Sequence, residues 1–132
     1  MLKLIIGVKG TGKTKTLISM VNAAVDASHG DVVCIEKGTK LRFDIKYQAR
    51  LINTEEYYVD DAASLAGFIA GILASNHDVT DVFVDSALKI CQNDVAAFEK
   101  LVETVAKFNA NIVFTVSLPV EEASDTLKKY LA

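Results

Sequence analysis

The chain has little of what interrupts or cross-links a fold: of its 132 residues, one is proline, seven are glycine and two are cysteine. A single proline and a 51% hydrophobic composition exclude a disordered or proline-rich chain and predict an ordered fold. Cys34 and Cys91 fall in no metal-ligand spacing and lie among apolar neighbours, so we expect reduced, buried thiols. The length suits one hydrophobic core, which predicts a single domain over residues 1–132.

Long apolar runs and an excess of positive charge are also missing. No run approaches the length of a membrane span, and the first apolar run, residues 2–6, is too short for a signal peptide. The formal net charge of −3 argues against an overall electrostatic attraction to nucleic acid or to an anionic membrane. We therefore expect a soluble, cytoplasmic protein without a membrane or nucleic-acid partner.

What the sequence does contain is a phosphate-binding loop motif, Gly7-Val8-Lys9-Gly10-Thr11-Gly12-Lys13-Thr14. It matches the pattern G-x-x-x-x-G-K-[ST] at each defined position. An apolar run of strand length precedes it, and residues 16–25 follow with apolar side chains at helical spacing. A strand, a glycine-rich loop and a helix in this order direct backbone N–H groups and the helix dipole at one point, where an anion is favoured. The sequence thus predicts a binding site for a nucleoside triphosphate.

Individual residues of the motif have predicted roles. Lys13 would reach the β- and γ-phosphates, and the hydroxyl of Thr14 would bind Mg²⁺. Gly10 and Gly12 would let the backbone wrap around a phosphate without a Cβ in the way. Lys9 either adds positive charge near the phosphates or points to solvent.

A second half of the site is expected at the run Val82-Phe83-Val84-Asp85. An apolar strand followed by an acid is the Walker B pattern, in which Asp85 would hold the Mg²⁺ of the bound nucleotide. The alternative is that Asp85 only caps or solvates the end of the strand.

Strands and helices alternate along the chain. We expect strands over residues 2–6, 32–35, 57–59, 82–84 and 112–116, and helices over 16–25, 62–75, 95–108 and 121–131, with Asp60 or Asp61 and Asn93 or Asp94 as caps. The alternation predicts an α/β fold, a three-layer αβα sandwich with a mainly parallel five-stranded sheet. Residues 37–53 stay ambiguous, because a short strand over 41–45 and a short helix over 46–51 are equally defensible.

Taken together, residues 1–118 resemble the RecA-type ATPase core of the P-loop NTPases. The segment Asp81-Val82-Phe83-Val84-Asp85-Ser86-Ala87 is similar to the Walker B segment of that family, including the serine after the aspartate. The resemblance implies a P-loop NTPase (RecA-like) fold with strand order 3-2-4-5-1. It further implies that Glu36, after the second strand, polarises the attacking water, although Glu36 could equally cap the strand. Ser117, after the fifth strand, takes the place of the sensor of the γ-phosphate, where the family has Asn or Gln.

The leading functional interpretation is an ATP-binding protein with slow, Mg²⁺-dependent ATPase activity that couples nucleotide state to conformation. Lys13 and Glu36 would be catalytic, residues 7–14 and Ser117 would bind the nucleotide, and Thr14 and Asp85 would bind the metal. A nucleotide switch with little hydrolysis is the alternative, and a small-molecule kinase is the third, disfavoured by the presence of only two arginines. The sequence has no Asn/Thr-Lys-x-Asp guanine-reading pattern, which favours ATP over GTP.

Two regions suggest partners. The basic segment 37–50, which holds both arginines, Arg42 and Arg50, is either a solvated loop, a lid or the source of an arginine acting in trans. The apolar strand 2–6 is expected at a sheet edge, so the chain is predicted to form a homo-oligomer or to bind another protein unless its C-terminal helix covers that edge.

Overall fold

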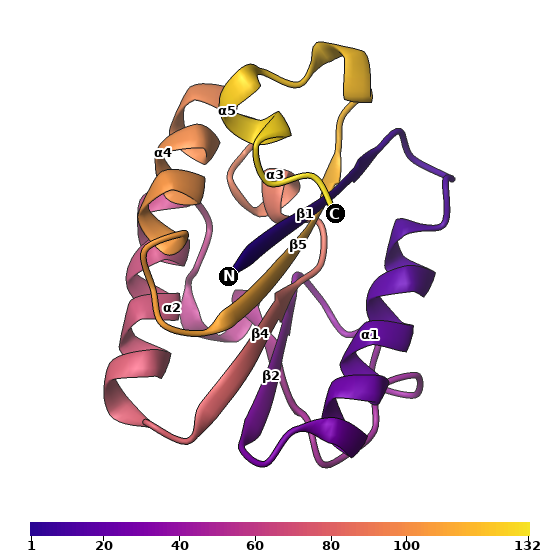
Figure 1. The fold of residues 1–132 in the computed structure, drawn as a ribbon, viewed down its shortest axis with the longest axis vertical. Helices are drawn as coiled ribbons and strands as arrows, with labels where there is room; N and C mark the ends of the chain where they lie inside the picture. Colours follow the sequence, from indigo (N-terminus) through magenta and orange to yellow (C-terminus); the bar gives the residue numbers. More distant parts are fainter.

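A five-stranded, all-parallel sheet forms the centre of the computed structural model, which describes residues 1–132 (Figure 1). Its strand order is β1-β5-β4-β2-β3, which is the expected order read from the other end. The strands are β1 (Leu2–Gly7), β2 (Asp31–Glu36), β3 (Arg50–Asn53), β4 (Val79–Val84) and β5 (Asn111–Ser117). The predicted α/β class and parallel sheet are confirmed.

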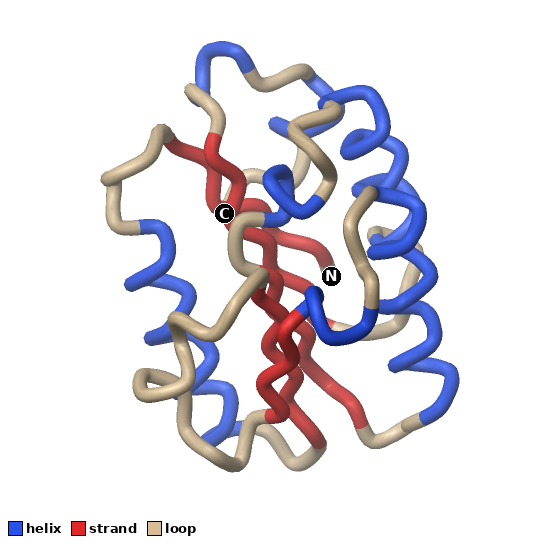
Figure 2. The backbone as a smooth tube through the Cα atoms, turned by 180° about the vertical axis from the view of Figure 1, so that it is seen from behind, coloured by secondary structure: helices blue, strands red, loops and turns tan.

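Helices flank the sheet on both sides, as Figure 2 shows from behind. The helix α1 (Lys13–Ala27) lies on one face, and the helices α2 (Ala62–Ser75), α3 (Ala87–Ile90), α4 (Val95–Val105) and α5 (Asp125–Lys128) lie toward the other (Figure 1). Two 3₁₀ turns, η1 (Thr54–Tyr57) and η2 (Val120–Glu122), complete the regular structure. This arrangement is that of a three-layer sandwich.

The strands are buried on both faces because alternate side chains enter two separate clusters. Val82 and Val84 of β4 pack in the larger cluster with α2 and α4, whereas Phe83 between them packs with Leu17 and Val21 of α1. This explains why the central strands read as unbroken apolar runs rather than as alternating ones. Cys34 and Cys91 are buried free thiols, as expected.

Each of the two predicted pairs of candidate helix caps contains one residue that acts as the cap, Asp61 for α2 and Asp94 for α4. The Asp61 carboxylate accepts a hydrogen bond from Ser64 N at 2.8 Å, and the Asp94 carboxylate accepts one from Ala97 N at 3.1 Å. Each satisfies an N–H group that has no partner inside its helix.

The prediction of a third strand at residues 57–59 is wrong. The strand β3 comes earlier, at Arg50–Asn53, and residues 54–57 form the turn η1. Asn53 ends the strand because its side-chain oxygen accepts hydrogen bonds from Glu55 N at 3.0 Å and from Gly38 N at 2.8 Å. Tyr58 then adopts a left-handed conformation, with φ of 59°, that no strand residue has.

Of the ambiguous segment 37–53, residues 50–53 form β3, and residues 37–49 are neither strand nor helix. It crosses the α1 face as a series of turns, in which Leu41, Ile45 and Ala49 are buried against α1 and Phe43 is 87% exposed. The side-chain amide of Asn22 on α1 holds this segment, since it donates to Asp44 O and accepts from Lys46 N, both at 2.9 Å.

The continuous helix expected over residues 121–131 is also wrong. Ser124 interrupts it: its side chain accepts a hydrogen bond from Leu127 N and starts the short helix α5 anew. The chain then returns to the outer side of β1, where Leu4 N donates to Tyr130 O at 2.8 Å and Ala132 N donates to Leu4 O at 2.9 Å. No helix of the structure has the length and apolar character needed to cross a membrane.

Candidate functional site

The carboxyl ends of three neighbouring strands meet around one cleft. β1 leads into the phosphate-loop motif, β4 ends just before Asp85, and β5 lies between them and ends at Ser117. Because the strands are parallel, these ends share one edge of the sheet. The cleft has a volume of about 570 Å³, and its lining includes seven of the predicted site residues: Lys9, Gly10, Gly12, Lys13, Thr14, Asp85 and Ser117.

The conformation of the loop explains two of its glycines. Gly10 and Gly12 have φ angles of 89° and 82°, a region that other residues rarely adopt. The carbonyl of Val8 closes the loop from within, since it accepts hydrogen bonds from Thr11 Oγ1 at 2.7 Å and from Lys13 Nζ at 2.9 Å. Gly7, Val8 and Thr11, which were predicted to bind the nucleotide, are not among the residues that line the cleft, and Val8 and Thr11 bond to each other within the loop.

The helix α1 presents its amino end to the same cleft. It has 15 residues, its N-cap is Gly12, and no side chain caps its first N–H groups. Its first turn contains no acidic residue and begins with Lys13 and Thr14. Free N–H groups and the positive end of the helix dipole favour an anion at this position.

The charge of the cleft is strongly positive although that of the chain is negative. Five lysines line it, against Asp85 as the one carboxylate: Lys9, Lys13, Lys15, Lys40 and Lys89. The last three were not predicted as site residues. Lys15 follows the motif directly, but Lys40 and Lys89 come from the turn after β2 and from α3, and only the fold brings them to the loop.

Asp85 joins three elements through hydrogen bonds. Thr14 Oγ1 of α1 donates to Asp85 Oδ1 and Oδ2 at 3.0 and 3.3 Å, and Thr115 Oγ1 of β5 donates to Oδ1 at 2.8 Å. Thr115 Oγ1 in turn accepts a hydrogen bond from Ser86 N at 2.6 Å. Thr115 was not predicted, although a threonine in an otherwise apolar strand was a usable indication. Asp85 thus links the end of β4 to α1 and β5 and also lines the cleft, which agrees with the metal-ligand interpretation and with the cap interpretation.

The oxygen atoms of Thr14 and Asp85 suit a hard divalent cation that is held mainly by a bound molecule such as a phosphate. The Thr14 hydroxyl and the Asp85 carboxylate offer oxygen atoms side by side, and no group of three or more His, Cys, Asp or Glu side chains is placed to hold a metal. Mg²⁺ is typically held by one or two protein oxygens together with phosphate oxygens and waters, so these two residues fit it.

Glu36 is placed differently from the other predicted residues. It is 3% exposed, and its carboxylate accepts hydrogen bonds from Lys40 N at 3.0 Å and from Leu41 N at 3.2 and 3.3 Å. Burial raises the pKa of this carboxyl against the lowering effect of the two N–H groups, and the nearby Asp85 raises it further. Glu36 does not line the cleft, but Lys40 and Leu41, which it holds, do.

The two arginines lie apart from the cleft lining. Arg42 stacks on the exposed ring of Phe43, with its guanidinium carbon 4.8 Å from the ring centroid. Arg50 begins β3 and so belongs to the opposite edge of the sheet. Of the basic residues in the segment 37–50, only Lys40 lines the cleft.

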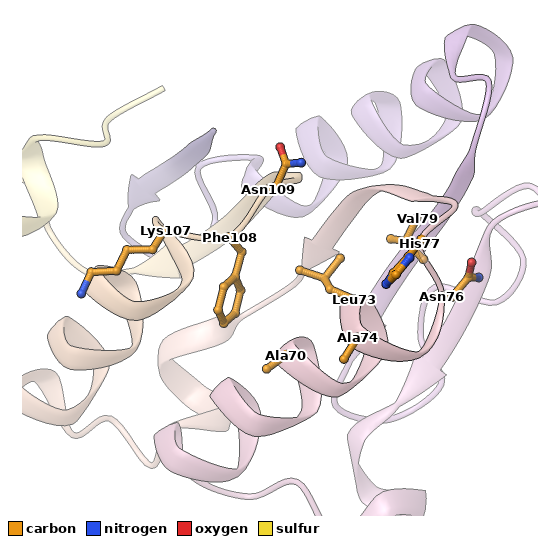
Figure 3. A pocket seen from close by; sticks show the side chains of 9 residues that line it. All are labelled: Ala70, Leu73, Ala74, Asn76, His77, Val79, Lys107, Phe108 and Asn109. Atoms are coloured by element: carbon orange, nitrogen blue, oxygen red, sulfur yellow. The ribbon is translucent and has the colours of Figure 1, made fainter.

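A second cavity, of about 460 Å³, lies at the other end of the strands from the cleft, between the end of α2, the start of β4 and the turn before β5 (Figure 3). His77 and Lys107 are its only titratable residues, and Lys107 points away from His77 in Figure 3. With no carboxylate and no convergent polar groups, this cavity is a poor candidate for a catalytic site. Comparison of the sequence with protein-family models and with curated proteins gives no match.

Proposed function

We propose that the chain is a P-loop NTPase with a RecA-like core, which binds ATP together with Mg²⁺ and hydrolyses it slowly. The observation that carries this proposal is the lysine-lined cleft at the amino end of α1, with Thr14 and Asp85 in contact at its floor. Phosphate groups need concentrated positive charge and N–H donors, and a metal between phosphate and protein needs the oxygen pair.

Each group has one role in this proposal. The α1 N–H groups, Lys13 and the further lysines bind the phosphates and stabilise the negative charge on them. Thr14 and Asp85 hold Mg²⁺, which when bound would neutralise charge on the phosphate oxygens. Ser117, at the end of β5, offers a hydroxyl to the γ-phosphate. Lys13 leaves its bond to Val8 O to reach the phosphates.

A nucleotide switch with little hydrolysis is the second candidate, and the position of Glu36 favours it. The cleft lining has no carboxylate other than Asp85, and Glu36, the residue proposed to activate water, binds backbone N–H groups instead. Water activation by Glu36 would first require the turn at Lys40 and Leu41 to release it. Measuring product release over hours distinguishes the two candidates, with a Lys13→Ala sample as the blank.

The proposal includes self-association of the chain. β1 is an edge strand, and the C-terminal residues pair with its outer side only at Leu4. Because the direction of the backbone groups alternates along a strand, the N–H and C=O groups of Leu2 and Ile6 point outward like those of Leu4. They are available to a second copy.

The test of the binding proposal is calorimetric titration with MgATP. Lys13→Ala should weaken binding at least about tenfold because it removes a charge-assisted contact with the phosphates. Lys100→Ala, at an exposed position of α4, is the matched control and should bind like the parent. Undiminished binding by Lys13→Ala, with the fold intact by circular dichroism, would contradict the site.

A further inference from the structure

A third pocket, of about 280 Å³, lies beside the phosphate cleft. It is formed by the start of the basic segment, by the residues after β3 and by the end of α3. Its buried floor consists of Thr54, Val59 and Ile90, and its rim carries polar and charged side chains. The volume is just below the range of about 300–1,000 Å³ in which drug-sized ligands bind, so its occupant is smaller than a nucleotide.

The floor of this pocket contains an unsatisfied hydroxyl. Thr54 is 1% exposed, and its Oγ1 has no hydrogen-bond partner, which is true of no other buried side-chain oxygen or nitrogen in the structure. A buried hydroxyl without a partner is costly, so the floor of this pocket is a point of low local stability.

The rim carries charges of both signs that are not used within the protein. Lys37, Glu55 and Asp60 line the pocket, and the only ion pair of the structure, Lys46 with Asp26, involves none of them. Their side chains also take part in no hydrogen bond. All three side chains are exposed and form no ion pair with one another, so charges of both signs are available to a ligand.

Backbone strain marks the same region. Four residues other than glycine have positive φ: Tyr58, Ser86, Gln92 and Asn93. Tyr58 and Gln92 line this pocket, and Ser86 and Asn93 line the phosphate cleft. Such conformations cost about 1–3 kcal/mol each and tend to gather at ligand-binding sites.

We propose that this pocket binds a small zwitterion of the amino-acid class. Glu55 and Asp60 bind its ammonium group, and Lys37 binds its carboxylate. Val59 and Ile90 provide an apolar surface for the carbon atoms between the charges. The site does not depend on nucleotide binding, and its test uses the chain without nucleotide.

The test is ligand-observed NMR with the full chain, using each of the standard amino acids singly and then butylamine and butyrate, which carry only one of the two charges. At least one amino acid should bind with a Kd in the millimolar range or tighter, and both single-charge probes should bind about tenfold more weakly or worse. Lys37→Gln and Asp60→Asn should each weaken amino-acid binding about tenfold, and Lys128→Gln should not.

Thr54→Val distinguishes the stability of the pocket floor from ligand binding at the rim. It should raise the midpoint of thermal unfolding by about 2 °C or more, because it removes an unsatisfied buried group, and it should leave amino-acid binding unchanged. The proposal is overturned if no amino acid binds at about 10 mM, if butylamine or butyrate binds equally well, or if Lys37→Gln and Asp60→Asn bind like the parent.

Discussion

Asp85 is the residue on which the two threonines of the site depend, since both Thr14 and Thr115 donate to its carboxylate. Asp85→Ala removes that acceptor and the proposed Mg²⁺ ligand together. We expect MgATP affinity to fall about tenfold or more, whereas ATP affinity in EDTA should stay the same or rise, because a negative charge leaves the cleft. Calorimetry with and without Mg²⁺ measures both. Equal losses in the two buffers would mean that Asp85 is structural only.

Glu36 provides a prediction about pH. Its pKa in the folded protein is raised above the ordinary value of 4.5, chiefly by burial, so the folded chain binds a proton more tightly than the unfolded chain does. The stabilisation from this group is therefore complete below about pH 4.5 and is lost as pH rises through the raised pKa. We expect the free energy of unfolding of the parent, relative to Glu36→Gln, to decrease with pH over this window. A difference that does not change with pH, measured by urea unfolding, would contradict the burial of an ionisable carboxyl.

The same Glu36→Gln variant tests the catalytic role of the residue. If Glu36 polarises water, the variant should bind MgATP normally and release product more slowly; its amide oxygen can still accept a hydrogen bond from Leu41 N. If Glu36 only holds the turn at Lys40 and Leu41, product release should match that of the parent, which would favour the switch.

At the scale of elements, the sequence predicted what local chemistry determines. The run Leu2–Ile6, the loop and α1 follow from a motif and two periodicities, and four of the five strands were found within a few residues of their bounds. The third strand was misplaced because Tyr57 and Tyr58 have high strand propensity, while the actual strand β3 has only two apolar residues between Arg50 and Asn53. Here the cap formed by the Asn53 side chain outweighed the strand propensity of the residues after it.

The site was predictable to the same extent. Five residues of the motif and Asp85 could be placed at the cleft from the sequence, because each follows a strand or opens a helix in a recognisable pattern. Lys40 and Lys89 could not be found in this way, since neither belongs to a motif. Both reach the cleft only because of the order in which β2, β3 and β4 lie in the sheet. Glu36 was identified by its position after a strand, but its position did not reveal that its carboxylate would bind Lys40 N and Leu41 N.

Asn53 connects β3, η1 and the turn at Gly38, and it allows a prediction at this scale. Asn53→Ala leaves Glu55 N and Gly38 N without their acceptor. We expect a loss of about 1–2 kcal/mol in the free energy of unfolding. Asn109→Ala, at an exposed position, is the control and should change it by less than about 0.5 kcal/mol. Urea unfolding measures both, and equal stability of the two variants would show that Asn53 does not hold these elements together.

At the scale of the whole molecule, the distribution of charge matters more than its sum. The chain carries a net charge of −3, yet five lysines and one carboxylate line the cleft. The remaining surface is therefore more acidic than the net charge indicates. A polyanion is repelled from most of the molecule and attracted to one cleft, which favours a small phosphate ligand over an extended nucleic acid.

The edge of the sheet at β1 is the other property of the whole molecule that matters, because it affects self-association. Residues 130–132 shield β1 at Leu4, and a chain that ends at Lys129 loses both of the hydrogen bonds made there. We expect the parent to associate weakly, and the shortened chain to associate more strongly, as concentration rises, because an apolar edge strand then lacks its cover. Ile5→Lys in the shortened chain should reverse the effect, since a charged side chain on an edge strand opposes pairing. Light scattering over a range of concentrations, with and without MgATP, checks all three chains. A mass near 14.3 kDa for parent and shortened chain at every concentration would refute association through this edge.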